Sequence, residues 1–345
     1  MNGLAIVLGA VLAVAPADEG PQLDPVRLYL EGRRAEALAA RSVQGDVDKR
    51  RELASMHELR KTHEPWAGAV LRAAIMLHTD RAQAGRGPSA GAETPRACGF
   101  GDDDVLARSI AGYAVERDDS REFVRRWFVA MARQSQWDLC LEDVRAWTAA
   151  GLKLFPRDPE LSLARGLGAE AAVRFGVKDH LNPTHDRSAV VRDLDEARDA
   201  YRLALQSAPD LLEARLGLGR TLWRQGKLDE ARAELERVAL DARDPARLDL
   251  ARLFLARVQD DASRPADAER AYRDALAARP SAQAATFGLA ELQARGGDGD
   301  GSRASLQPVL AAAPHPDGAD PHTFYHLGLG QVQELMDALR EETLQ

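Results

Sequence analysis

The feature that most constrains the fold is a spacing of 34 residues in the second half of the chain. Ala197 and Tyr201 begin a helical pattern, and Ala231 follows Ala197 by 34 residues. The same interval separates Ala268 from Ser302. A repeat of 20 to 50 residues is typical of a protein built by stacking identical helical or strand units. The sequence therefore predicts a repeat architecture.

The first helix of each repeat contains a leucine followed by a small residue. These pairs are Leu167-Gly168, Leu218-Gly219, Leu255-Ala256, Leu289-Ala290 and Leu327-Gly328. In three repeats this small residue lies 12 residues before a small residue of the second helix, as Gly219 lies before Ala231. Apolar residues at helical spacing together with small residues predict two helices that approach closely, with Tyr201 or Tyr272 filling the space beside them. One hairpin cannot bury its apolar face alone, so neighbouring hairpins must stack.

This pattern resembles the tetratricopeptide-repeat family over about residues 159–330. The resemblance implies an all-α fold, an α-solenoid of antiparallel helical hairpins with a concave surface that binds a protein or peptide. Two departures predict longer connections. The interval from Ala231 to Ala268 is 37 residues, and Gly168 precedes Ala197 by 29 residues instead of 12.

Composition agrees with an all-α fold and argues against one class of partner. The chain has 345 residues, few aromatic residues (5%) and a net charge of −8. Phosphate backbones attract basic proteins, so we expect no nucleic-acid partner.

The N-terminal residues 1–17 resemble a signal peptide. An apolar run from Leu4 to Ala15 precedes Ala15-Pro16-Ala17, although no basic residue precedes the run. We expect cleavage after Ala17 and export to the periplasm or outside the cell. The run is too short for a stable membrane span. Cys98 and Cys140 can form a disulfide in such a compartment or remain two thiols, and the sequence leaves both alternatives open.

Helical patterns and composition divide the rest of the chain. Residues 18–81 are expected to be helical and to resemble degenerate repeats, and residues 82–104 to form a flexible linker rich in Gly, Pro, Ser and Asp. Residues 105–156 are expected to form a divergent helical hairpin. Residues 157–345 are expected to form the repeat array, ending in a capping helix.

No motif for a cofactor, a metal or a nucleophile is recognised, so we expect a scaffold or adaptor without cofactor or metal and not an enzyme. The alternative is an accessory subunit or hydrolase that acts on an envelope polymer. Its acidic residues would be Glu116, Asp118 and Asp119.

The family resemblance places particular residues of the first helices on the concave surface. They are Arg165, Glu213, Leu216, Arg220, Trp223, Arg224, Leu253, Arg257 and Phe287. Such a surface is basic and partly aromatic, and we expect it to bind an acidic or carboxylate-bearing segment through guanidinium groups. The alternative is that the arginines form ion pairs with neighbouring acids.

Overall fold

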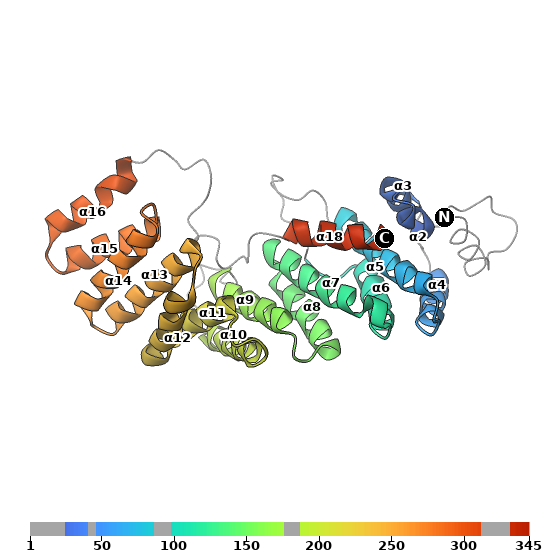
Figure 1. Cartoon of the computed structure of the whole chain (residues 1–345), viewed down its shortest axis with the longest axis horizontal. Coiled ribbons are helices and arrows are strands. Elements are labelled where there is room, and N and C mark those ends of the chain that lie inside the picture. Colours follow the sequence, from blue (N-terminus) through green and yellow to red (C-terminus); the bar gives the residue numbers. More distant parts are fainter. Residues whose placement is uncertain (1–24, 41–45, 86–97, 176–186, 312–331, 345) are drawn as a thin grey trace, which may run out of the picture. The chain divides into compact units, whose positions relative to one another are not determined.

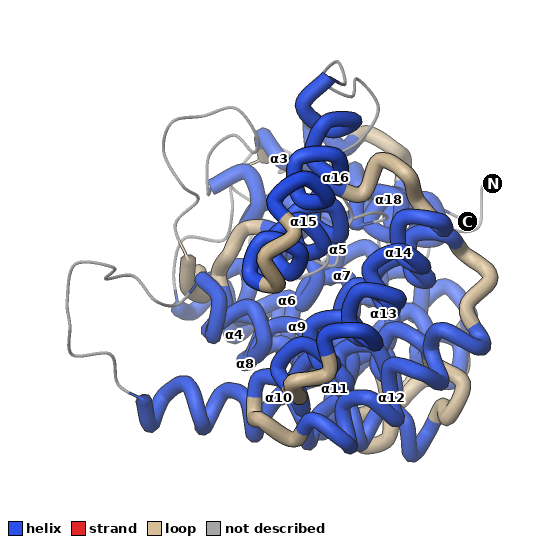
Figure 2. Tube along the Cα trace, turned by 90° about the vertical axis from the view of Figure 1, so that its left-hand side faces the viewer, coloured by secondary structure: helices blue, strands red, loops and turns tan. Residues whose placement is uncertain are grey.

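The computed structural model describes residues 25–40, 46–85, 98–175, 187–311 and 332–344. Within these ranges the chain forms sixteen helices and no strand (Figures 1 and 2). The predicted all-α solenoid of helical hairpins is confirmed. None of the helices in the described ranges is long and apolar enough to cross a membrane. The predicted signal peptide and the Leu327-Gly328 pair lie outside the described residues.

The chain divides into two compact units, residues 1–155 with 330–345 (unit 1) and residues 156–329 (unit 2). The helices of unit 1 are α2 (Pro25–Leu30), α3 (Arg34–Ala39), α4 (Asp46–Leu59), α5 (Pro65–Gly85), α6 (Asp102–Ala114), α7 (Asp118–Trp137), α8 (Leu141–Leu154) and α18 (Val332–Leu344). The helices of unit 2 are α9 (Pro159–Phe175), α10 (Arg187–Ser207), α11 (Leu212–Arg224), α12 (Leu228–Asp241), α13 (Pro245–Asp261), α14 (Pro265–Ala278), α15 (Gln283–Arg295) and α16 (Gly299–Ala311).

One turn geometry recurs in both units and defines the repeat. The second residue after the end of the first helix has a left-handed backbone in five hairpins, at Gly32, Leu139, Gly226, Ser263 and Gly297. In each turn the next amide donates to a carbonyl five residues earlier, as the amide of Lys227 does to Leu222 at 2.9 Å. This is the pattern of a Schellman helix end, which satisfies carbonyls that the helix leaves free. The hairpins α2–α3 and α7–α8 therefore have the same turn as those of unit 2.

The core of unit 2 depends on the close approach that glycine permits. Tyr201 of α10 lies against Gly166 of α9 and Gly217 of α11, and a Cβ atom on either glycine would meet its ring at less than 3 Å. Gly219 lies equally close to Leu235 of α12, and Gly288 of α15 lies against Tyr272 of α14. Small residues thus pack beside an aromatic ring, and these contacts join α10 to α11 and α14 to α15.

The boundaries in unit 1 differ from those expected. Helix α5 continues to Gly85, because Ala82, Gln83 and Ala84 are good helix formers. Helix α6 begins at Asp102, where three consecutive acids favour a helix start. The expected linker at 82–104 therefore includes helix at both of its ends, and its residues 86–97 lie outside the described part. The segment expected to form one hairpin, 105–156, contains three helices, and α6 pairs with α5.

The position of the C-terminal helix also differs from the expected one. Helix α18 packs against α5 and α7 of unit 1, whereas we expected it to cap the repeat array (Figure 1). Its apolar side chains Met336 and Leu339 are fully buried there. The sequence pattern shows that α18 is amphipathic but does not show which helices cover its apolar face.

Cys98 and Cys140 form a disulfide, with Cα atoms 5.2 Å apart. It attaches the segment before α6 to the start of α8. The amide of Gly99 donates to Asp143 at 2.9 Å, and Phe100 packs edge-on against Trp147. The disulfide therefore joins the exposed Cys98 to the buried Cys140, and Phe100, which follows Cys98, packs on a tryptophan that is 0% exposed.

Candidate functional site

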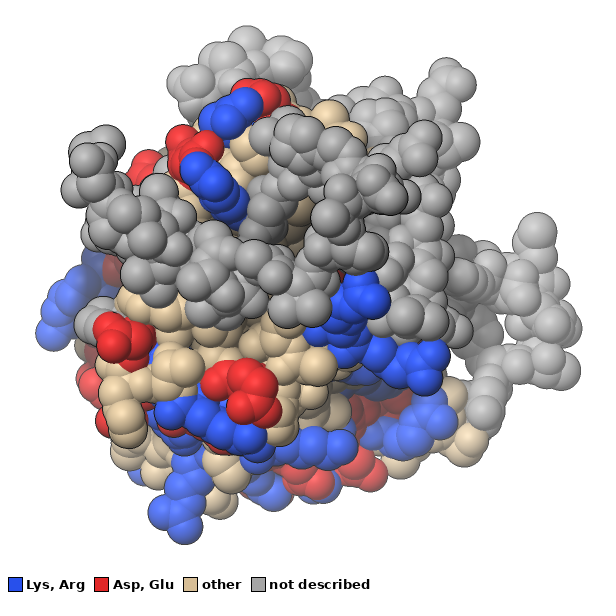
Figure 3. Space-filling model, turned by 90° about the vertical axis from the view of Figure 1, so that its right-hand side faces the viewer, with Lys and Arg blue, Asp and Glu red and all other residues tan. Residues whose placement is uncertain are grey.

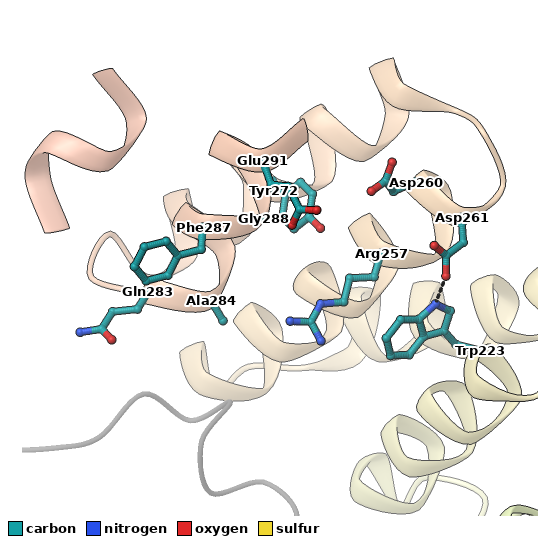
Figure 4. Close-up of a pocket in the computed structure, with 10 residues that line it drawn as sticks. All are labelled: Trp223, Arg257, Asp260, Asp261, Tyr272, Gln283, Ala284, Phe287, Gly288 and Glu291. Carbon is teal, nitrogen blue, oxygen red and sulfur yellow. Dashed lines mark hydrogen bonds between the residues drawn. The ribbon is translucent and has the colours of Figure 1, made fainter. Parts of the chain in front are cut away.

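A cavity of about 520 Å³ opens on unit 2 where three first helices and α14 meet (Figure 4). It is lined by Trp223 of α11, by Arg257, Asp260 and Asp261 of α13, by Tyr272 of α14, and by Gln283, Ala284, Phe287, Gly288 and Glu291 of α15. Its volume lies within the range of about 300–1,000 Å³ that is typical of binding sites. We call it the α11–α15 pocket.

Helical periodicity brings the lining residues together. Residues three and four apart lie on one face of a helix, and Ala284, Phe287, Gly288 and Glu291 have this spacing. The short turns place the first helices α11, α13 and α15 next to one another in consecutive hairpins. One face of each therefore borders the same cavity.

The guanidinium group of Arg257 is held by aromatic rings. Its central carbon lies 5.7 Å from the ring centre of Trp223 and 5.4 Å from that of Phe254. Both distances are within the range of a cation–π interaction. Arg257 makes no hydrogen bond or ion pair with the residues that the structure describes. The pocket thus contains a positioned cation whose N–H groups are available to a ligand.

The acidic residues of the pocket differ in whether they form hydrogen bonds or ion pairs within the protein. Asp261 accepts a hydrogen bond from the indole nitrogen of Trp223 at 2.7 Å, and Asp260 forms an ion pair with Arg295. Glu291 is exposed and has no hydrogen-bond or ion-pair partner among the described residues. Among the described residues, the pocket therefore has one cation, Arg257, and one anion, Glu291, that form no ion pair.

Apolar and polar surfaces meet in the same cavity. Phe287 is 51% exposed, an unusual position for a large aromatic side chain. Tyr272 is buried against Gly288, and burial raises the pKa of its hydroxyl to about 12, so the side chain stays neutral. An apolar ligand group on Phe287 would therefore lie near both the guanidinium of Arg257 and the carboxylate of Glu291 (Figure 4).

The structure brings three of the nine predicted surface residues together, namely Trp223, Arg257 and Phe287. The other six lie elsewhere. Leu216 and Leu253 are in the core, 4% and 1% exposed, so they are not on the surface as expected. Glu213 forms an ion pair with Arg247, and Arg165 forms one with Glu196 at 2.9 Å. Arg224 is half-buried and does not line the pocket.

Arg220 requires a correction, because it is 2% exposed and cannot reach a ligand. Its Nε and Nη2 atoms donate to the two oxygens of Glu170 at 2.9 and 2.8 Å. Glu170 is itself 0% exposed and also accepts from the hydroxyl of Tyr201 at 2.9 Å. Arg220 thus belongs to a buried ion pair between α9 and α11. Its partner lies 50 residues earlier in the chain, too far for local spacing to predict.

Asp260 and Glu291 were not among the predicted site residues, although their positions within the repeats match those of predicted ones. Arg257 directly follows the small residue Ala256, and Glu291 directly follows Ala290 in the next repeat. Asp260 holds the same position relative to Ala256 that Trp223 holds relative to Gly219. Glu291 therefore holds the position of Arg257 in the next repeat, and Asp260 holds that of Trp223. The same comparison also selects Arg220, which is buried, so repeat position alone does not identify the site residues.

Two of the three acids of the alternative hydrolase hypothesis, Glu116 and Asp119, form ion pairs in unit 1, and the third, Asp118, is exposed. Asp119 accepts from Arg117 at 2.6 Å and from Ser120 at 2.9 Å, and Glu116 pairs with Arg60 at 2.7 Å. Partial burial raises the pKa of Asp119, but the hydrogen bonds from Arg117 and Ser120 outweigh it and hold the pKa below its usual value. A lowered pKa makes Asp119 a weak proton acceptor at neutral pH.

The described surface visible in Figure 3 carries both basic and acidic side chains. Binding of phosphate backbones requires a basic stripe or patch. That the chain has no nucleic-acid partner stays a prediction from its net charge of −8.

Comparisons with known proteins agree with the repeat structure. Models of the tetratricopeptide repeat match residues 192–253 and 253–315. No curated protein matches the chain significantly in sequence. Among solved structures, MamA from Desulfovibrio magneticus RS-1 is 16% identical, with a TM-score of 0.44, over 54% of this chain and 93% of that one. Pseudomonas aeruginosa pilF is 15% identical, with a TM-score of 0.47, over 65% and 89%. These two similarities are too distant to indicate a function.

Proposed function

Since this chain is a tetratricopeptide-repeat protein, we propose that it is a scaffold that binds a segment of a partner protein in the α11–α15 pocket. Repeats of this family support protein–protein interaction. The observation that carries the proposal is the unpaired guanidinium of Arg257, held over Trp223 beside the exposed Phe287. An exposed aromatic beside a positioned arginine is the combination that dominates many binding interfaces.

The charges of the pocket define the segment more narrowly than the sequence did. A run of acids would meet Asp260, Asp261 and Glu291, and like charges across an interface oppose binding. The favoured ligand carries one carboxylate for Arg257 and an apolar side chain for Phe287. A basic group near Glu291 would complete the match. We therefore propose a mixed-charge segment with an apolar anchor.

Selection of a phage-displayed peptide library against the full chain tests this proposal. Selected peptides are expected to combine a carboxylate with an apolar residue. Arg257→Gln and Phe287→Ser are each expected to weaken their binding about tenfold or more, because each removes a charge-assisted hydrogen bond or an apolar anchor. Fluorescence polarisation with the selected peptides measures the change.

Leu240→Ser is the matched control. Leu240 is 74% exposed on the second helix α12 and does not line the pocket. Binding by this variant should equal that of the unchanged protein. Peptides that bind all three variants equally well would show that recognition occurs outside the pocket.

We also propose that the protein is exported. The signal-like residues 1–17 motivate this proposal, and the disulfide between Cys98 and Cys140 supports it, because disulfides persist mainly in oxidising compartments. N-terminal sequencing of the purified native protein is expected to begin at Asp18. A mature protein that begins at Met1 and is recovered from the cytoplasm would contradict export.

A further inference from the structure

Helix α18 lies on unit 1 as an amphipathic helix on a surface of other helices (Figure 1). Met336, Leu339 and Thr343 are at most 1% exposed and share one face. Asp337 and Glu341 are exposed on the other face. The helix contacts α5 and α7 and, to a smaller extent, α2.

A buried carboxylate receives the arginine of α18. Arg340 donates to one oxygen of Asp80 from Nη2 at 2.9 Å and from Nε at 3.2 Å. Asp80 has no exposed side-chain surface, and its second oxygen accepts from the hydroxyl of Tyr29 at 2.8 Å and pairs with Arg34 at 2.7 Å. Two residues further along, Glu342 forms an ion pair with Arg126 of α7. Helix α18 is therefore held on unit 1 both by buried apolar side chains and by ion pairs.

The surface beneath α18 corresponds to the one that carries the pocket in unit 2. Helices α2 and α7 each precede a left-handed turn, at Gly32 and Leu139, as α11, α13 and α15 do. Helix α5 lies next to both, in contact with α2 and α7. In unit 2 the equivalent first helices border a cavity, whereas in unit 1 a helix of the chain itself covers them. The same type of surface is open in one unit and occupied in the other.

We propose that the α2–α5–α7 surface is a binding site for an amphipathic helix of a partner protein, and that α18 occupies it until the partner displaces α18. The partner helix would carry large apolar residues at the positions of Met336 and Leu339 and an arginine at the position of Arg340, which reaches Asp80. Helix α18 has 13 residues, a length at which a helix is marginal without its contacts. Attachment to the chain gives it a high effective concentration, so a partner must bind more tightly than α18 does as a free peptide.

A labelled peptide of residues 332–344 tests whether the surface binds a helix in trans. The full-length variants Arg340→Glu and Leu339→Asp are expected to release α18 and to bind the peptide at least tenfold more tightly than the unchanged chain does. Glu341→Arg, an exposed change on the same helix, is expected to behave like the unchanged chain. A peptide that itself carries Arg340→Glu should not bind. Release of α18 without any gain in peptide binding would overturn the proposal.

Hydrogen exchange of the unchanged protein provides a test that does not depend on the folding of a variant. Displacement requires that α18 can leave while α5 and α7 stay folded. The amides of α18 are therefore expected to exchange at least tenfold faster than those of α5 and α7. Equal rates in the three helices would show that α18 opens only when unit 1 unfolds, and they would overturn the proposal. Because the site lies in unit 1, neither result bears on the α11–α15 pocket.

Discussion

Replacing Arg220 with methionine is expected to lower the free energy of unfolding of unit 2 by about 3–5 kcal/mol. The change leaves Glu170 buried without its cation, because that carboxylate is 0% exposed and both of its oxygens accept from Arg220. An unpaired buried charge is among the most destabilising features in a protein. Urea unfolding followed by circular dichroism measures the loss, and hydrogen exchange identifies unit 2 as the part affected.

Two further variants separate the ion pair from a general effect of removing arginine. Arg273→Met removes an arginine that is 62% exposed and paired with Glu269, and we expect at most about 0.5 kcal/mol of change. Adding Glu170→Gln to Arg220→Met removes the unpaired charge and is expected to restore part of the stability. A loss below about 1 kcal/mol in Arg220→Met would mean that Glu170 reaches water or another cation.

Removal of the disulfide is expected to destabilise unit 1 by about 2–4 kcal/mol. Cys98 and Cys140 are separated by 42 residues, and cross-linking a loop of this length lowers the entropy of the unfolded chain. The double variant Cys98→Ser/Cys140→Ser, compared with the oxidised protein in urea, measures this contribution. Faster amide exchange is expected first in α8 and around Phe100, which packs on Trp147.

A reducing agent provides the control for this prediction. Reduction of the unchanged protein should lower its stability by the same amount, whereas the double variant should not respond. If reduction left the unfolding midpoint unchanged, the cysteines would not be cross-linked in the protein as purified. The support that the disulfide gives to export would then be lost.

The sequence predicted the hairpins of unit 2 from the small residues that mark the contacts between helices. Gly219 lies against Leu235 of the next helix, as its spacing from Ala231 indicated. Gly226 and Gly297 have left-handed backbones in the turns, although the prediction did not depend on them. Leu139 and Ser263 have the same backbone conformation without glycine, which is uncommon for such residues. The α7–α8 hairpin was therefore recognisable from the sequence only as a divergent one.

The sequence predicted only part of the candidate site, because the other interactions join residues that lie far apart in the chain. The family resemblance placed Trp223, Arg257 and Phe287 on one surface, and all three line the α11–α15 pocket. The burial of Arg220 depends on Glu170 in another helix, and the packing of α18 depends on Asp80, which is 260 residues from Arg340. Helical periodicity describes one face of one helix. It contains no information on which distant helix will cover that face.

The position of α18 has a consequence for the order in which the protein is made. Unit 1 consists of residues 1–155 and 330–345, so all of unit 2 is synthesised before the last helix of unit 1 emerges. Until then Asp80 lacks Arg340, and the surface that will hold Leu339 is uncovered. The N-terminal unit is therefore completed last, and a nascent or truncated chain would present its helix-binding surface to other proteins before its own helix can cover it.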